Sequence, residues 1–434
     1  MMDGESPVLR QLLERRPSET IRPGLTAIRR LLARLGDPHR HLSVIHVAGT
    51  NGKGSVIAFL EAMLKAAGVP VARFTSPHLH RFNERIRLDG HEIADADLDP
   101  LLVETLAADP DEETTFFELT TAAAFLHVAR QARFKSGAGI VLLETGLGGR
   151  LDATNVVTPL LSIVTAIGLD HRDYLGPSLE RIAFEKAGIL KAGVPAVADT
   201  AGRDTMRVLW GVARRRGVPL EGAGRDFRQR IVADGLGWAG SWRFEDREGA
   251  MHLPKPALPG GHQYANAALA VAGLRLLRRE GGLGISDAAI RSGVEAARWP
   301  GRLERFPGPP PVWLDGAHNP DGARALRSFL QSPESGAGRG PTVLLFSVLA
   351  NKDGDTMVRL LAPLADAVIV VPLGGARGRS ASELQGLWPD GMRVVACADT
   401  RQALALARGM ASTEGRVVVT GSLLLVGEAR SLLC

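Results

Sequence analysis

Short apolar runs rich in β-branched residues alternate with longer stretches of helical periodicity along most of the chain. In the first part, these runs predict strands over residues 42–48, 69–74, 139–144, 161–167 and 194–198. Helices are predicted after most of these strands, including residues 53–67 and 179–190. Because parallel strands need a long crossover between them, usually a helix, the alternation is typical of an α/β protein with a mainly parallel sheet.

A block from about residue 227 to residue 258 breaks this alternation. It combines alternating apolar and polar positions with glycine turns, so it predicts a small antiparallel β insertion. Helices are expected again over residues 264–279 and 286–297.

The chain is predicted to change domain near residues 299–302, where a segment rich in proline and glycine follows. Beyond it, strands are predicted at residues 312–315, 343–347, 367–371, 394–398 and 417–420, each followed by a helix. This pattern favours a compact doubly wound domain, and residues 331–340 are predicted to form a flexible surface loop. We therefore expect an α/β protein of two domains. Residues 1–297 carry the mainly parallel sheet with its β insertion, and residues 298–434 form a smaller, Rossmann-like domain.

Composition narrows the class of protein. The chain has 434 residues, of which 45% are hydrophobic, so it can bury a sizeable core and is not a disordered chain. Its apolar runs fall far short of the roughly 20 residues that a membrane helix needs. The first residues lack the basic-then-apolar order of a signal peptide, and two cysteines exclude a disulfide scaffold. We therefore expect a cytoplasmic protein without a membrane partner.

The net charge of +5 raises the question of an anionic partner. Only seven of the 52 basic residues are lysines, and the arginines are scattered instead of clustering with aromatic residues. Since binding of single-stranded nucleic acid relies on such clusters, we expect no nucleic-acid partner. Arginine serves wherever this sequence needs a plain positive charge, so the few lysines point to chemistry that arginine cannot perform.

The strongest motif is a glycine-rich turn between a predicted strand and a predicted helix, VIHVAGTNGKGSV over residues 44–56. Glycines let backbone N–H groups surround phosphate oxygens, and the helix N-terminus adds partial positive charge. Lys53 would then contact the β- and γ-phosphates, and Ser55 a magnesium ion. The spacing departs from G-x-x-x-x-G-K-[ST], and a turn without a ligand is the alternative. The motif predicts a P-loop ATPase domain in residues 1–297.

Other chemistry-bearing residues follow other predicted strands, where ligands bind in parallel sheets. Glu144 ends a buried strand and either holds Mg²⁺ or caps the glycine-rich loop after it. His171 follows the next strand and is either a ligand or a structural residue. Lys186 lies within a predicted helix, and Asp315 directly follows the first strand of the second domain.

Together these segments resemble the Mur ligase superfamily, and within it the folate branch of folylpolyglutamate synthases and dihydrofolate synthases. The resemblance extends from about residue 35 to residue 430 and preserves the family's order of motifs. Its segments are residues 46–56, 75–79, 82–86, 116–120, 258–267, 299–302, 315–320 and 420–428.

The resemblance implies a role for each matching residue. The implied catalytic residues are Lys53, Lys186 and His171. The implied nucleotide-binding residues are Asn51, Gly52, Lys53, Gly54, Ser55, Asn266, Arg302 and Asp315. The implied metal ligands are Ser55, Ser76, Glu144 and His171. The pteroate or folate would contact Phe116, Phe117, Glu118, Leu119, Leu151, Asp152 and Ala153, and the incoming glutamate His318 and Ser422.

The implied reaction uses ATP and Mg²⁺ to activate a carboxylate of dihydropteroate or of a reduced folate, to which L-glutamate is then joined. The resemblance further implies a monomer and a carbamylated Lys186. Within the family, we expect both the dihydrofolate synthase and the folylpolyglutamate synthase activity, with folylpolyglutamate synthase alone as the alternative. A P-loop ATPase driven by nucleic acid and a cell-wall ligase of the wider superfamily are the competing interpretations.

Overall fold

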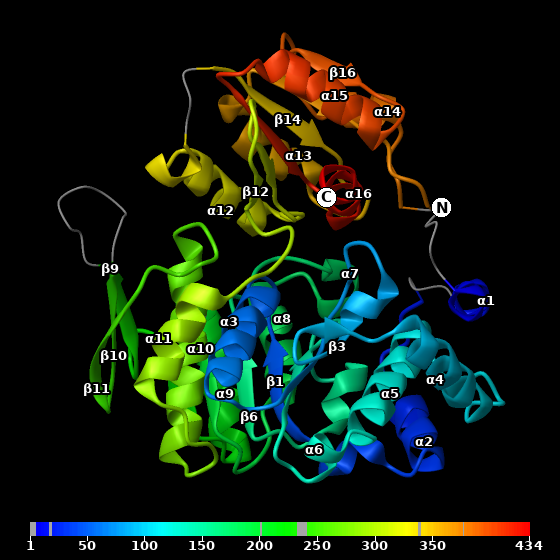
Figure 1. Ribbon diagram of the computed structural model, residues 1–434, viewed down its shortest axis with the longest axis vertical. Coiled ribbons are helices and arrows are strands. Elements are labelled where there is room, and N and C mark those ends of the chain that lie inside the picture. Colours follow the sequence, from blue (N-terminus) through cyan, green and yellow to red (C-terminus); the bar gives the residue numbers. More distant parts are fainter. Residues whose placement is uncertain (1–5, 17–19, 200–201, 232–240, 337–339, 376) are drawn as a thin grey trace. The chain divides into compact units, whose positions relative to one another are not determined.

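The computed structural model describes residues 6–16, 20–199, 202–231, 241–336, 340–375 and 377–434 (Figure 1). The chain divides into two compact units. Unit 1 comprises Met1–Arg230, Trp242–Lys255 and Ala265–Ala297, and unit 2 comprises Ile231–Ser241, Pro256–Tyr264 and Arg298–Cys434. Within the described residues, no helix is long and apolar enough to cross a membrane.

An eight-stranded sheet forms the centre of unit 1, in the order β4-β3-β2-β5-β1-β6-β7-β8. Its strands are β1 (Ser43–Ala48), β2 (Val71–Phe74), β3 (Ile86–Leu88), β4 (His91–Glu92), β5 (Ile140–Glu144), β6 (Leu161–Val164), β7 (Ala196–Ala198) and β8 (Leu220–Gly222). The six strands from β2 to β8 in this order are parallel, and the pairings of β3 with β2 and with β4 at one edge are antiparallel. The strands β1, β2, β5 and β6 are buried almost throughout, as strands covered on both faces must be.

Helices lie around this sheet, some packed on its strands and some on other helices. They are α1 (Pro7–Arg15), α2 (Thr26–Arg34), α3 (Lys53–Ala66), α4 (Asp95–Ala107), α5 (Phe116–Ala129), α6 (Ala132–Lys135), α7 (Arg172–Leu175), α8 (Leu179–Lys186), α9 (Arg203–Arg216), α10 (His262–Arg279) and α11 (Asp287–Ala296). The helix α10 begins in unit 2 and continues into unit 1. The helices α3 and α11 run side by side (Figure 1). Glycine at position 293 allows their close approach, because a Cβ there would lie 2.4 Å from the Cα of Met63.

The predicted β insertion is a three-stranded sheet in the order β11-β10-β9. Its strands are β9 (Arg228–Ile231), β10 (Trp242–Asp246) and β11 (Gly249–Leu253), and β10 and β11 pair antiparallel. Residues 232–240 of the predicted block lie outside the described part of the chain.

A buried ion pair joins this small sheet to α10. The Arg275 guanidinium donates from Nε and Nη2 to the two carboxylate oxygens of Asp246, at 2.9 and 2.7 Å. Both side chains are at most 3% exposed, and Arg275 lies 5.6 Å from the ring centroid of Phe244. Arg279 extends the network from Asp246 to Glu221 on β8. Because the charges are desolvated, removing one partner leaves the other uncompensated.

Unit 2 contains a six-stranded sheet in the order β12-β13-β17-β14-β15-β16. Its strands are β12 (Glu304–Phe306), β13 (Val312–Leu314), β14 (Thr342–Phe346), β15 (Ala367–Val370), β16 (Val394–Ala396) and β17 (Arg416–Thr420). All are parallel except β12, which pairs antiparallel with β13. The helices are α12 (Pro320–Leu330), α13 (Gly354–Leu361), α14 (Ala381–Gln385), α15 (Thr400–Ala411) and α16 (Leu423–Leu433).

The structure differs from the sequence predictions in several places. The short strand β12 lies where the sequence indicated only a connection between domains. The strand β6 ends at Val164 instead of residue 167, and α8 ends at Lys186 and continues as a 3₁₀ turn, Ala187–Ile189. The segment 331–340 contains a 3₁₀ turn, Pro333–Ser335, so it is not wholly irregular, and residues 337–339 lie outside the described part.

We predict that Arg275→Met lowers the free energy of unfolding by about 3 kcal/mol, because Asp246 then stays buried with part of its charge uncompensated. The measurement is urea unfolding of both proteins, followed by circular dichroism. Arg207→Met is the control: its exposed pair with Asp204 contributes at most about 1 kcal/mol. Equal shifts for the two variants would contradict the prediction.

Candidate active site

The candidate site of unit 1 lies where four adjacent parallel strands end. The neighbours β2, β5, β1 and β6 run in the same direction, so the segments after them meet at one edge of the sheet. Ser76 follows β2, Glu144 ends β5, the glycine-rich turn follows β1, and His171 follows β6. The sheet order therefore collects residues that are far apart in the sequence.

The glycine-rich turn holds a conformation that requires its glycines. Gly52 has φ +90°, and a Cβ there would lie 2.5 Å from Oδ1 of Asn266. A Cβ at Gly49 would collide with the Thr165 hydroxyl, 1.7 Å away. The turn leads directly into α3, whose first N–H groups have no partner within the helix. Such a turn is a suitable cradle for phosphate groups.

Lys53 begins α3 and points its amine back over the turn. Its Nζ donates to the carbonyl oxygens of Gly49 and Thr50, both at 3.2 Å. It also lies 3.8 Å from Oε1 of Glu144. The structure thus brings together the phosphate loop and the carboxylate at the end of β5.

Glu144 and the two predicted serines supply oxygen atoms of the kind that Mg²⁺ prefers. The Glu144 side chain is buried, and its Oε2 accepts a hydrogen bond from the backbone N–H of Ser76 at 3.1 Å. Ser55 is buried in the first turn of α3. A carboxylate held beside a phosphate cradle fits a magnesium ion that is shared with a nucleotide.

His171 is the N-terminal flanking residue of α7 and has the left-handed φ of +51°. Its backbone N–H donates to Oδ1 of Asp170 at 2.8 Å, and its Nε2 lies 3.9 Å from the same oxygen. The imidazole is 36% exposed, so it is accessible at the edge of the sheet.

Lys186 lies 137 positions from the phosphate loop in sequence and is in direct contact with it in the fold. Its Nζ donates to the carbonyl oxygen of Gly49 at 2.7 Å, and the residue is only 4% exposed. Burial, reinforced by the charge of Lys53, lowers the pKa of the Lys186 amine to about 7, although Asp170 and Asp152 oppose the shift. A substantial part of this amine is therefore neutral near pH 7.

The glycine-rich loop of residues 146–155 packs against the helix that carries Lys186. A Cβ at Gly188 would lie 2.2 Å from the Cα of Arg150, so the two backbones touch. Arg150 also pairs with Glu185 through its Nε and Nη2. Within this loop, Leu151 is half-buried and Ala153 is buried.

Asp152 is buried in the same loop. Its Oδ2 accepts from the backbone N–H of Leu147 at 2.7 Å, and its Oδ1 accepts from the N–H of Thr154 at 3.0 Å. Burial raises the pKa of the Asp152 carboxyl, while these donors act in the opposite direction.

The four residues 116–119 begin α5, and they do not share one environment. Phe116 and Leu119 belong to the hydrophobic core, and Glu118 accepts from the N–H and hydroxyl of Thr115 as a helix cap. Phe117 is half-buried, and its ring lies against Gly146, where a Cβ would be 2.5 Å from Cζ. Of these residues, Phe117 is the one in contact with the glycine-rich loop.

The remaining predicted residues lie in unit 2. Asp315 follows β13 and accepts from the N–H groups of Leu303 and Ala317, both at 3.0 Å. Burial raises the pKa of the Asp315 carboxyl, and the neighbouring Arg302 opposes the shift. Arg302 lies over Gly316, where a Cβ would be 2.2 Å from its Nη1.

His318 and Ser422 follow two adjacent parallel strands, β13 and β17. His318 Nδ1 lies 2.8 Å from the carbonyl oxygen of Gly316. Ser422 caps α16 by accepting from the N–H of Leu424. Asn319 between them in sequence caps α12, because its side chain accepts from the N–H of Gly322 at 2.9 Å.

Sequence reasoning missed His46 and its partner Thr154, which lies in the glycine-rich loop. His46 in β1 is fully buried, and its Nε2 lies 2.8 Å from Oγ1 of Thr154. The available signal was a histidine in the middle of an otherwise apolar strand.

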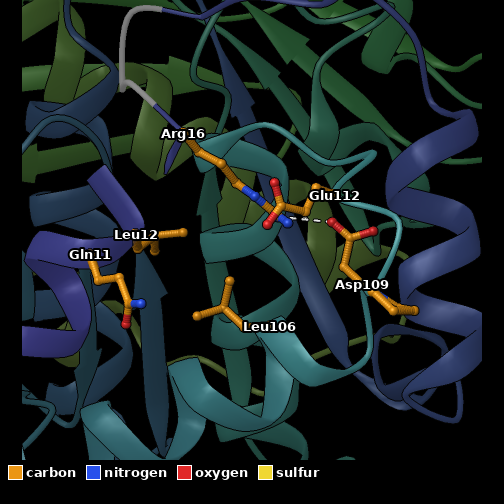
Figure 2. Close-up of a pocket in the computed structure, with 7 residues that line it drawn as sticks. Gln11, Leu12, Arg16, Leu106, Asp109 and Glu112 are labelled. Carbon is orange, nitrogen blue, oxygen red and sulfur yellow. Dashed lines mark ion pairs between the residues drawn. The ribbon is translucent and has the colours of Figure 1, made fainter. Parts of the chain in front are cut away.

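A separate cavity of about 190 Å³ lies beside α1 and α4 (Figure 2). It shares no residue with the site, and it contains the buried ion pair between Arg16 and Asp109, at 2.8 Å. Its lining residues are Gln11, Leu12, Arg16, Leu106, Asp109, Pro110 and Glu112.

Comparison with known proteins gives consistent matches over almost the whole chain. Residues 47–274 match the Mur ligase middle domain, and residues 301–423 match the Mur ligase glutamate ligase domain. The dihydrofolate synthase/folylpolyglutamate synthase of Bacillus subtilis is 36% identical over 95% of each chain.

Two solved structures extend these matches. Escherichia coli FolC in complex with DHPP and ADP has a TM-score of 0.87 and 33% identity, covering 99% of this chain and 98% of its own. The bifunctional folylpolyglutamate synthase/dihydrofolate synthase with Mn, AMPPNP and L-glutamate bound has a TM-score of 0.86, 33% identity and the same coverage.

We predict that Lys186→Met raises the melting temperature at pH 7 by at least about 2 °C, the shift that about 1 kcal/mol produces in a large domain. The pKa of Lys186 is lowered from 10.5 to about 7 on folding, so the buried ammonium costs most below pH 7, and this cost shrinks as the pH rises toward 10.5. Thermal unfolding of both proteins between pH 7 and 9.5 should show the difference narrowing. Lys65→Met, at an exposed lysine, is the control and should leave the melting temperature unchanged. A destabilised Lys186→Met protein at pH 7 would contradict the prediction.

Proposed function

The chain belongs to the Mur ligase family, in its dihydrofolate synthase/folylpolyglutamate synthase branch, and on this premise we propose how its own residues perform the reaction. It is an ATP-dependent ligase that joins L-glutamate to a carboxylate of a folate-type substrate. The observation that carries the proposal is the convergence of Lys53, Glu144 and Lys186 around the glycine-rich turn.

The chemical problem is that a carboxylate is a poor electrophile, because oxide would have to leave. Attack by a carboxylate oxygen on the γ-phosphorus of ATP expels ADP and forms an acyl phosphate. The amine of glutamate then attacks the acyl carbon, and the tetrahedral intermediate expels phosphate and loses a proton to give the amide. Both steps bring negative charges together, so positioned cations and N–H donors lower the barrier.

We assign the triphosphate to the turn and the start of α3. The N–H groups of residues 52–55 donate to phosphate oxygens, and the Lys53 ammonium neutralises charge at the β- and γ-phosphates. Asn51 within the turn and Asn266 beside it are also assigned to the nucleotide, and the position of Asn266 against Gly52 supports its assignment. Within unit 2, Arg302 and Asp315 are assigned to nucleotide contacts.

We assign Ser55, Ser76, Glu144 and His171 to a divalent cation. A bound Mg²⁺ would offset phosphate charge as the carboxylate approaches. Glu144 is held for this role by the Ser76 N–H and by its proximity to Lys53. Manganese in the structure of a relative supports a divalent metal in this family.

Substrate contacts are assigned to two sets of residues. The pteroate or folate is assigned to the loop residues Leu151, Asp152 and Ala153 with Phe117, which packs on that loop. The core positions of Phe116 and Leu119 and the capping role of Glu118 point to support of Phe117 instead of direct contact. The glutamate is assigned to His318 and Ser422.

Lys186 is proposed to carry a carbamate. A neutral amine attacks CO₂ at carbon and releases a proton, which replaces a buried cation by an anion near Lys53. The lowered pKa and the exclusion of water support this step. We predict that ¹³C-bicarbonate gives the wild-type protein a carbamate carbonyl signal in ¹³C NMR that Lys186→Met lacks. The same signal in both proteins would contradict the assignment.

The relatives named for both activities support a bifunctional enzyme, with folylpolyglutamate synthase alone as the alternative. That the enzyme acts as a cytoplasmic monomer without nucleic acid stays a prediction. Size-exclusion chromatography with light scattering tests whether the enzyme is a monomer. ATP turnover with added DNA or RNA tests whether nucleic acid stimulates it.

The decisive assay supplies ATP, Mg²⁺ and L-glutamate with dihydropteroate in one reaction and with a reduced folate in another. We expect ADP and a product one glutamate heavier in both reactions, measured by mass spectrometry. Product in only one reaction would identify a monofunctional enzyme. UDP-linked muramoyl substrates, supplied in place of the folate substrate, should give no ligated product.

Lys53→Ala should lower kcat/KM in this assay by about 100-fold or more, the effect of removing one positioned charge-stabilising group. Lys65→Ala, in the same helix but exposed, should keep the wild-type rate. Wild-type activity in Lys53→Ala would refute the assigned phosphate site.

A further inference from the structure

We propose that His46 is a positioning residue for substrate binding, which acts through the Thr154 hydroxyl to hold the Asp152 carboxylate in place. The inference rests on the proposed function, because it takes Asp152 as a contact of the pteroate or folate. It adds two residues that have no role in the assignments above.

The chain of contacts crosses from the centre of the sheet to the glycine-rich loop. His46 Nε2 lies 2.8 Å from Thr154 Oγ1, between residues 108 positions apart. Thr154 Oγ1 in turn donates to Asp152 Oδ1 at 2.5 Å. All three side chains are at most 5% exposed, so water does not compete for these bonds.

The direction of the hydrogen bonds follows from the donors that are available. A hydroxyl has one hydrogen, and Thr154 donates it to Asp152. The contact with His46 therefore requires the hydrogen on His46 Nε2. His46 Nδ1 is buried and has no hydrogen-bond partner among the described residues, which suits a bare lone pair better than an N–H group.

His46 does not change its protonation state in the pH range where enzymes are assayed. Burial, aided by the charge of Lys191, lowers the pKa of His46 to about 3. The imidazole thus stays neutral, and its Nε2–H remains a donor to Thr154 throughout.

The contact between His46 and Thr154 matters for Asp152 because the other hydrogen bonds that this carboxylate accepts are local. Leu147 and Thr154 donate backbone N–H groups from within the same loop, so they move with it. The His46 contact is different, since β1 is a central, fully paired strand of the sheet. It ties the carboxylate to a rigid element, and a site held by a rigid element keeps its geometry.

The test compares the wild-type protein with His46→Leu, Thr154→Val and the double variant. Thr154→Ser keeps the hydroxyl, and His46→Gln keeps a donor near the position of Nε2. Thr105→Val is the matched control, because Thr105 is also a fully buried threonine, and its hydroxyl donates to Leu101 O within α4. The measurements are KM for dihydropteroate, KM for ATP, kcat and the melting temperature.

We expect His46→Leu and Thr154→Val each to raise the KM for dihydropteroate about tenfold and to leave the KM for ATP within about twofold. The KM of the double variant for dihydropteroate should be no higher than that of either single variant, because both changes break the same series of hydrogen bonds. Thr154→Ser and His46→Gln should stay within about threefold of wild type, and Thr105→Val should not change either KM.

Three results would overturn the inference while the proposed function stands: an unchanged KM for dihydropteroate in active variants, equal increases in both KM values, or the same loss in Thr105→Val. If His46→Leu fails to fold, Thr154→Val and Thr154→Ser decide by the same criteria. A wild-type protein that ligates glutamate to neither folate substrate would instead refute the proposed function, and the inference with it.

Discussion

The site of unit 1 depends on the protein holding the carbonyl oxygens of its own phosphate loop. Gly49 O accepts from both Lys53 and Lys186, Thr50 O accepts from Lys53, and Asn51 O accepts from Thr165. The backbone N–H groups of Thr50 and Asn51 donate to the carbonyl oxygen of Ala166, so the donors that the turn offers to an anion are those at the start of α3. The same bonds require glycine at positions 49 and 52, where a side chain would collide with Thr165 or Asn266.

This arrangement places two amines beside one carbonyl, and burial of the second amine appears in the lowered pKa of Lys186. Burial of the Lys186 ammonium lowers the stability of the folded protein, and it leaves the amine partly neutral at pH 7. Perturbed pKa values of this kind are typical of functional sites, where titratable groups are held in protonation states that they would not adopt in water. A stabilising substitution at Lys186 would therefore remove the chemistry that its burial makes possible.

The loop of residues 146–155 links the two halves of this site. On one side it touches α8 through Gly188 and Glu185, next to Lys186. On the other it is tied to β1 by His46 and carries Asp152. Because β1 also leads into the glycine-rich turn of residues 49–52, that turn and the loop that carries Asp152 are both held by one strand.

The sequence by itself determined the α/β class, the β insertion and the glycine-rich turn between a strand and a helix, because these depend on local periodicity and glycine placement. The rarity of lysine directed attention to Lys53 and Lys186, whose roles stay predictions. Sequence reasoning missed β12, which pairs with β13 across residues 307–311, because the proline and glycine of that segment indicated only a connection between domains. It also did not separate Phe117 from its buried neighbours Phe116 and Leu119. Only the tertiary structure decided that Lys186 meets Gly49 and that His46 meets Thr154. Those contacts join residues more than 100 positions apart, and they exist because the sheet order places β5, β1 and β6 side by side, which no local pattern specifies.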